Sequence, residues 1–170
     1  MDIVIPTNNE NTFVAMAEKL GTKELLFLYS VQNFKYEKNN GVICSPAQLK
    51  EAKKKTSTVF VKAEGDVRKL IEQKPYAVYG FEYLENKDSF HHRRSGIDQV
   101  SAKIMADNDV AYAFSFSDLL NAPPYMQSIV LGRMYQNLMI AKKYKVKVIF
   151  ASFATTQYEL RNEKDMKCLV

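Results

Sequence analysis

Residues 91–120 read HHRRSGIDQVSAKIMADNDVAYAFSFSDLL, and this stretch carries the clearest structural signal in the chain. A basic patch and a Ser-Gly turn are followed by an amphipathic helical pattern over about residues 98–106. An apolar run of strand length then covers residues 110–116 and ends in the polar residues Ser117 and Asp118. Loop, helix, buried strand and polar strand end together make one structural unit, and the rest of the chain follows the same plan.

Working outward from this unit, apolar runs alternate with helical patterns along the whole chain. A near-continuous apolar run such as residues 24–31 is typical of a parallel strand buried on both faces. This alternation predicts an α/β fold with a parallel sheet. We expect strands at residues 2–6, 24–31, 58–63, 76–84, 110–116 and 146–151, with a short extension at 42–44, and helices at residues 13–20, 45–55, 67–73, 98–106, 125–144 and 163–170.

The length of the chain limits how such units can be arranged. The 170 residues form about six units and show no linker, so we expect one domain spanning residues 1–170. A complete eight-stranded α/β barrel typically needs about 250 residues and rarely fewer than about 200. The sequence therefore predicts a compact or incomplete barrel.

The composition describes a basic protein without membrane signals. The net charge of +5 and the sequence pI of about 9.1 favour polyanionic partners, although many basic proteins bind none. Cys44 and Cys168 lie far apart and are expected to be reduced thiols. Because we find neither an apolar run of about 18 residues nor a signal-peptide pattern, we expect a cytoplasmic protein with no membrane partner.

Motifs for metal or nucleophilic catalysis are weak. His91 and His92 are the two histidines of the chain, and Glu82 or Asp88 could assist them as metal ligands, but zinc sites draw on better-separated residues. A solvated basic loop explains the histidines as well. The serines lie outside any GxSxG motif, and both phosphate-binding glycine motifs are missing. Asp98 suits either a general base or the N-terminus of a helix.

A set of basic residues in the second half of the chain is the stronger candidate site. These residues fall in loops or at helix ends, and closure of a barrel could bring several of them to one face. Arginine guanidinium and lysine ammonium groups would then bind a phosphate backbone without contacting bases specifically. Each charge taken alone also suits a solvated surface. The set comprises Arg93, Arg94, Lys103, Arg133, Lys142, Lys143, Lys145 and Arg161.

The second half also carries a recognisable order of short motifs. These motifs are Ser-Gly-Ile-Asp-Gln-Val at 95–100, Ala-Lys-Ile-Met at 102–105, Val-Ala at 110–111, Phe-Ser-Phe at 114–116, Leu-Leu at 119–120, Pro-Tyr at 124–125, Lys-Tyr-Lys-Val at 143–146, Ala-Ser-Phe-Ala at 151–154, Arg161 and Asp165. In this order and spacing, residues 87–167 resemble the archaeal ribonuclease P protein component 3 family, relatives of the eukaryotic thirty-kilodalton subunit. The first eighty residues agree only in the layout of their elements.

The resemblance implies a TIM-barrel-like fold and a protein subunit of ribonuclease P, the ribonucleoprotein that removes the 5′ leader of precursor tRNA. In that family the RNA and its magnesium ions carry the chemistry, so we expect no cofactor and no active site on the protein. The implied partners are ribonuclease P RNA, precursor tRNA, component 2 and the other protein subunits. The resemblance favours Arg94, Lys103, Lys143 and Arg161 as RNA contacts, and it implies that Gly96 and Asp98 shape the loop and cap the helix.

Two other functions fit parts of the sequence. One is a small barrel-like metal-dependent hydrolase, related to phosphoesterases, with His91 or His92 as a metal ligand. The other is a shortened paralogue that keeps the protein-binding surface but has lost RNA binding. Family members usually continue for a few tens of residues beyond the point where this chain ends, and the basic loop at residues 91–94 is unusual for the family. Closure of the barrel is therefore the structural question to answer first.

Overall fold

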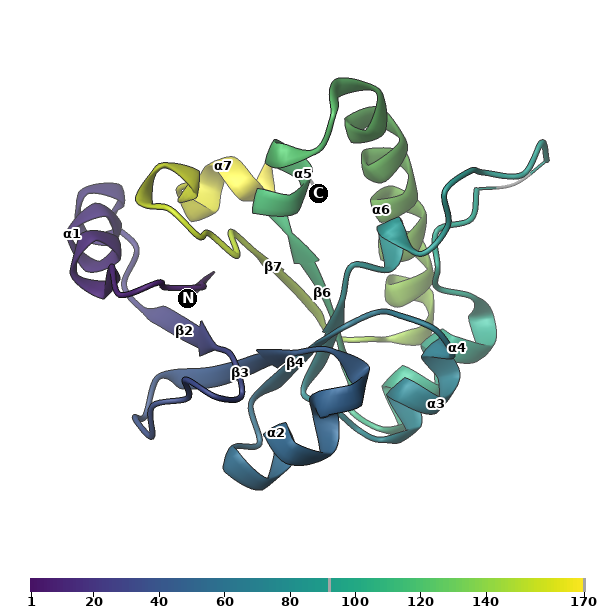
Figure 1. The fold of residues 1–170 in the computed structure, drawn as a ribbon. Coiled ribbons are helices and arrows are strands. Elements are labelled where there is room, and N and C mark those ends of the chain that lie inside the picture. The colour runs from purple at the N-terminus through teal and green to yellow at the C-terminus, as the bar shows by residue number, and fades with distance from the viewer. Residues whose placement is uncertain (92, 170) are drawn as a thin grey trace.

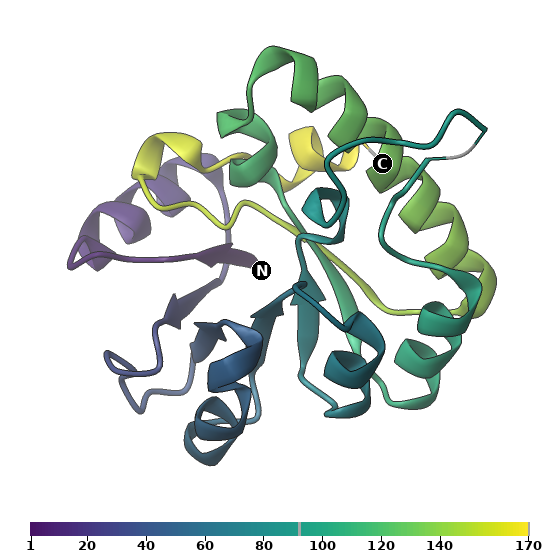
Figure 2. The same ribbon diagram turned by 45° about the vertical axis from the view of Figure 1, so that its right-hand side comes forward.

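A parallel sheet of seven strands forms the centre of the protein in the computed structural model, which describes residues 1–91 and 93–169. Each strand pairs with the next one in chain order, and the sheet rolls up with the helices on its outside (Figures 1 and 2). The strands are β1 (Asp2–Val4), β2 (Leu25–Tyr29), β3 (Asn40–Cys44), β4 (Val59–Lys62), β5 (Ala77–Tyr79), β6 (Ala111–Ser115) and β7 (Val148–Ala151).

The helices cover the outer face of this sheet. In the part of the chain that the structure describes, none of them is long and apolar enough to span a bilayer. The α-helices are α1 (Glu10–Leu20), α2 (Leu49–Lys55), α3 (Val67–Glu72), α4 (Gln99–Asp107), α5 (Phe116–Asn121), α6 (Pro124–Tyr144) and α7 (Glu163–Lys167). Short 3₁₀ helices lie at η1 (Pro46–Gln48), η2 (Phe81–Tyr83) and η3 (Gln157–Glu159).

The barrel is nearly closed, because the first strand meets the last one along a short seam. Two backbone hydrogen bonds, 2.8 and 3.3 Å long, join the chain around Val4 to Ala154, just beyond β7. Beside them, the buried carboxylate of Asp2 accepts hydrogen bonds from the backbone N–H (2.7 Å) and the hydroxyl (2.6 Å) of Ser152. This arrangement confirms the expected TIM-barrel-like α/β fold.

The expectation of six strands was wrong by one. Residues 42–44 are not an extension but part of β3, which pairs with β2 on one side and β4 on the other. The strand is difficult to recognise in the sequence because no helix precedes it. A loop of residues 30–39 connects β2 to β3 instead, and the buried side chain of Val31 packs in the core beneath α2.

Two strand ends also differ from expectation. Ser117 and Asp118 lie in α5 and not at a polar strand end, because the hydroxyl of Ser115 accepts a hydrogen bond from the backbone N–H of Asp118 (3.1 Å) and starts a helix there. Strand β5 ends at Tyr79, earlier than expected, because Gly80 adopts a φ of 80° and turns the chain into η2. The role of this glycine is conformational, since the nearest atom to a Cβ placed there is 3.7 Å away.

The loop before α4 has the geometry that the family resemblance implied. Gly96 has a φ of 87°, and a Cβ at this position would lie 2.4 Å from the carbonyl oxygen of Phe81. The carboxylate of Asp98 accepts a hydrogen bond from the backbone N–H of Ser101 (2.7 Å) and thereby caps α4. Glycine is therefore required at 96, and Asp98 is a capping residue rather than a free base.

Side chains alternate between two apolar layers along each strand. Inside the barrel, small residues on β5, β6 and β7 leave room for three rings, and Phe153 lies 5.7 Å from Phe60 and 5.6 Å from Tyr79 between ring centroids. Outside the barrel, residues such as Val78 and Tyr112 pack against the helices. The interior is thus a packed core and not a channel.

The seam between β1 and β7 gives a first prediction. Replacing Asp2 with Ala leaves the buried N–H and hydroxyl of Ser152 without a partner, so we expect it to lower the free energy of unfolding by about 2–3 kcal/mol. Asp2→Asn is the matched control, because an amide can accept from the N–H and donate to the hydroxyl. Urea unfolding of both variants measures the difference, and equal stability of Asp2→Ala and the unmodified chain would contradict the role of this contact.

Candidate functional site

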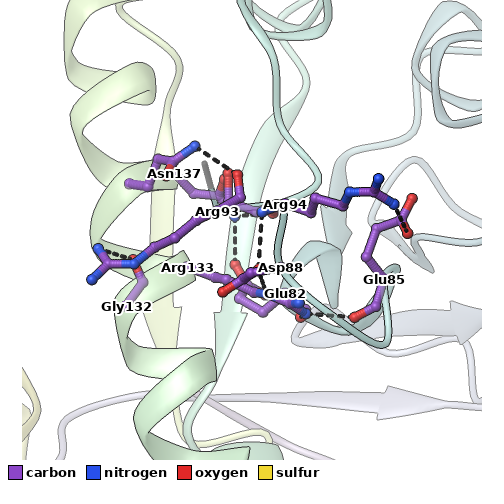
Figure 3. A network of polar contacts seen from close by, with 10 residues as sticks. Glu82, Glu85, Asp88, Arg93, Arg94, Gly132, Arg133 and Asn137 are labelled. Atoms are coloured by element: carbon purple, nitrogen blue, oxygen red, sulfur yellow. Dashed lines mark hydrogen bonds and ion pairs between the residues drawn. The ribbon is translucent and has the colours of Figure 1, made fainter. Parts of the chain in front are cut away.

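A buried arginine connects the segment after β5 to the long helix α6. Arg133 is completely buried (0% exposed), and its Nε donates to Oδ1 of Asp88 at 2.8 Å. Its Nη1 donates to the backbone carbonyl oxygens of Glu82 (2.7 Å) and Glu85 (2.6 Å), as Figure 3 shows. These bonds fix the beginning of the basic loop, taken here as residues 86–95, against the helix.

One turn further along α6, Asn137 extends this network into the core. Its Nδ2 donates to Oε1 of Glu82 (2.9 Å) and to the carbonyl oxygen of Ser95 (2.8 Å). The hydroxyl of Tyr112 on β6 donates to the same carboxylate oxygen of Glu82. Burial raises the pKa of Glu82, and these hydrogen bonds counteract only part of that effect. Both ends of the basic loop are therefore attached to α6.

The two arginines of the basic loop are exposed but already have partners within the chain. The Arg93 guanidinium lies over the backbone of Gly132 and donates to its carbonyl oxygen (3.4 Å). Nη1 of Arg94 lies 3.2 Å from the Glu85 carboxylate, and its backbone N–H donates to Asp88 at 3.0 Å. Partial burial acts to raise the pKa of Asp88, but the contacts with Arg94 and Arg133 hold it below its ordinary value.

The prediction that Arg133 contacts RNA needs a correction. Its guanidinium is enclosed by the protein and engaged by a carboxylate and two carbonyl oxygens, so a phosphate group outside the protein cannot reach it. Arg133 is a structural residue that positions the basic loop. The sequence did not reveal this, because arginine is seldom fully buried unless it has such partners.

The remaining candidate residues do not converge on one face. Lys103 is exposed in the middle of α4. Arg161 lies beyond β7 at the carboxyl end of the barrel, where its guanidinium donates to the carbonyl oxygens of Tyr158 (2.7 Å) and Leu160 (2.8 Å). At the opposite end, where the chain enters β7, are Lys142, Lys143 and Lys145, all of them exposed.

Other lysines, not predicted as site residues, also lie at this amino end of the barrel. Lys74 and Lys147 precede β5 and β7, and the lysines at 53–55 precede β4. The signal was present in the sequence, since parallel strands of one barrel all begin at the same end. Lysines that precede different strands must therefore lie on one face.

The features considered for catalysis have structural roles or lie apart. Among the residues that the structure describes, no group of three or more His, Cys, Asp or Glu side chains is placed to hold a metal ion. His91 is exposed, with its ring 5.0 Å from that of Phe90, and His92 lies outside the described residues. Burial raises the pKa of the Cys44 thiol to about 11, whereas Cys168 is exposed.

Two hollows lie on the surface near these elements. A groove of about 820 Å³ runs between α3, the basic loop and α6, and two of its arginines pair with carboxylates, Arg68 with Asp98 at 2.6 Å and Arg94 with Glu85 at 3.2 Å. A hollow of about 650 Å³ lies at the carboxyl end of the barrel and is lined by Lys62, Tyr83 and Asp118, among others. Neither hollow has a clear excess of one charge over the other.

Comparison with known proteins gives relatives for this chain, although no family model matches it. It is 35% identical over 80 residues to ribonuclease P protein component 3 of Thermococcus kodakarensis, a match covering 47% of this chain and 36% of that protein. It is 29% identical over 132 residues to the protein of the same name from Methanocaldococcus jannaschii, covering 74% and 54%. The chain thus spans about half the length, or less, of these curated relatives. The relatives confirm the resemblance seen in the sequence.

A solved structure has a similar fold. A chain in the cryo-EM structure of archaeal ribonuclease P with mature tRNA matches with a TM-score of 0.72 and 23% sequence identity, and the match covers 98% of this chain and 80% of that one. This likeness independently supports the assignment of the fold.

The role assigned to Arg133 can be tested by substitution. Arg133→Ala removes the ion-pair partner of Asp88 and the side-chain donor to two carbonyl oxygens, and it opens a cavity, so we expect a loss of about 3 kcal/mol in the free energy of unfolding. Arg93→Ala, on the exposed loop, is the matched control and should change stability by less than about 1 kcal/mol. If urea unfolding gave the two variants equal stability, the structural role of Arg133 would be wrong.

The buried carboxylate of Glu82 gives a prediction about pH. Its pKa is raised in the folded state, so its protonated form favours folding, and that contribution is lost as pH rises through the folded-state pKa. Glu82→Gln keeps the acceptor oxygen for Tyr112 and Asn137 without the charge. We therefore expect the variant to gain stability relative to the unmodified chain as pH rises from 4.5 towards neutral. Unfolding measured across this range checks it, and a constant or falling difference would contradict it.

Proposed function

We propose that this chain is a protein subunit of ribonuclease P, which removes the 5′ leader of precursor tRNA. The observation that carries the proposal is the sequence similarity to proteins named ribonuclease P protein component 3, which for one relative extends over 74% of this chain. The barrel fold agrees with it. The sequence has 24 basic side chains against 19 acidic ones, and this positive net charge suits a protein that binds RNA.

In this proposal the protein supports an RNA catalyst and has no active site of its own. The RNA and its magnesium ions carry out the hydrolysis, and the chain, acting as one domain over residues 1–170, binds and stabilises the RNA. The partners are ribonuclease P RNA, precursor tRNA, component 2 and the other protein subunits, and the compartment is the cytoplasm. The polar contacts between β5 and α6 agree with this proposal, because Arg133, Asn137 and Asp88 position the basic loop.

Reconstitution tests the proposal. Precursor-tRNA cleavage is measured with archaeal ribonuclease P RNA and its other protein subunits, with and without this chain, over a range of magnesium concentrations. We expect cleavage at low magnesium to require the chain, because its cations relieve the repulsion between RNA strands that magnesium otherwise screens. The chain alone should cleave nothing.

Two results would contradict the proposal in different ways. If the chain joined the other subunits but changed neither RNA binding nor cleavage, it would be a paralogue that has lost its RNA function. If the chain cleaved a phosphoester alone in a metal-dependent manner, a hydrolase would replace the subunit. Omitting the RNA from the mixture is the control that separates these two results.

A further inference from the structure

The amino end of the barrel carries most of the surplus positive charge of the protein. The helix ends and loop residues that directly precede β2–β7 lie at this end, in residues 21–24, 38–39, 53–58, 72–76, 107–110 and 142–147. They contain ten lysines and four carboxylates, so the rest of the chain holds 14 basic and 15 acidic side chains and has no positive surplus. The lysines are Lys23, Lys38, Lys53, Lys54, Lys55, Lys74, Lys142, Lys143, Lys145 and Lys147, here named the lysine ring.

The lysine ring differs from the arginines in its partners. Within residues 1–91 and 93–169, the ion pairs closer than 4.0 Å include three of the five arginines but none of the ten lysines. The other two arginines, Arg93 and Arg161, donate to backbone carbonyl oxygens. All but one of the ring lysines are exposed, Lys55 being half-buried. Lys53 and Lys55 donate to the carbonyl oxygens of Gln73 and Val31, and the other eight ring lysines present exposed ammonium groups to an external anion.

Contacts between these segments show that lysines before β3, β4, β5 and β7 lie around one mouth of the barrel, while the segment before β6 adds the exposed Asp107 and Asp109. Nζ of Lys147, before β7, lies 5.4 Å from the ring centroid of Tyr76, before β5. Tyr76 and Lys38 line one small cavity of about 160 Å³ at this mouth. On the β4 side, Nζ of Lys53 donates to the carbonyl oxygen of Gln73 at 2.7 Å. Connections that are far apart in the sequence are therefore neighbours here.

Helix capping explains only part of this pattern. Lysines in the last turns of α2 and α6 complement the partial negative charge of those helix ends. Lys38 and Lys147 lie outside helical turns, and Lys38 follows no helix at all. A role in neutralising helix dipoles does not account for these two residues, and a ligand of opposite charge does.

We propose that the lysine ring docks against the phosphate backbone of RNA. The inference rests on the proposed function and deepens it by assigning the RNA-facing surface. The ammonium groups on flexible lysine side chains act as point charges and contact the phosphate backbone of RNA without selecting bases. The ring therefore supplies affinity and orientation rather than sequence recognition. Enzymes with this fold place their active sites at the carboxyl end, whereas this chain meets RNA at the opposite, amino end.

The experiment compares two triple variants that lose the same charge. Lys54→Gln, Lys143→Gln and Lys147→Gln remove three charges from the lysine ring, and Lys50→Gln, Lys62→Gln and Lys164→Gln remove three exposed charges elsewhere. Binding to archaeal ribonuclease P RNA is measured as the salt concentration is raised from about 50 to about 300 mM. We expect the ring variant to bind roughly ten-fold or more weakly and to reduce the salt slope by about 2, and the control to change little.

The outcomes separate this inference from the proposed function. If the unmodified chain binds the RNA and the two variants weaken binding equally, the lysine ring is not the docking surface although the subunit assignment stands. If the unmodified chain and its subunit mixture do not bind the RNA at all, the proposed function itself fails. Unchanged thermal unfolding of the ring variant excludes loss of fold, since all three side chains are exposed and lack carboxylate partners among the described residues.

Discussion

Closure of the sheet between β1 and β7 is the constraint on which the rest of the structure depends. A parallel sheet of seven strands has two open edges unless its first and last strands meet. Here they meet through the Val4–Ala154 bridge and through the Asp2 carboxylate, which accepts two hydrogen bonds from Ser152. Because the strands are parallel, all of them start at one edge of the sheet, and closure bends this edge into one mouth of the barrel. The lysines that precede the individual strands are thereby arranged around that mouth.

Arginine and lysine have different roles in this protein. The guanidinium group can satisfy several acceptors at once, and Arg133 uses this ability to hold Asp88 and two carbonyl oxygens in a buried site. Its burial, together with that of Asn137, fixes the basic loop on α6 and leaves the loop arginines paired within the chain. The lysines remain at the surface, where a hydrated ammonium group can exchange its counterions for phosphates.

Much of the fold could be predicted from the sequence, because apolar runs such as those of β2 and β6 and the long pattern of α6 are strong local signals. Strand β3 was missed because the helix that normally separates parallel strands is replaced by a loop, and α5 was missed because its first residues continue an apolar strand. The site was harder to predict. Residue spacing places Arg133 on α6 but does not show that its face of the helix is buried against a carboxylate from residue 88.

The most direct test of the central claim, that the amino end of the barrel faces RNA, is a map of lysine reactivity. An acylating reagent modifies the chain with and without archaeal ribonuclease P RNA, and mass spectrometry measures the modification at each lysine. We expect Lys54, Lys74 and Lys143 to lose reactivity when RNA is bound, while Lys50 and Lys164 keep theirs. Protection of Lys50 and Lys164 with an unchanged lysine ring would contradict the account.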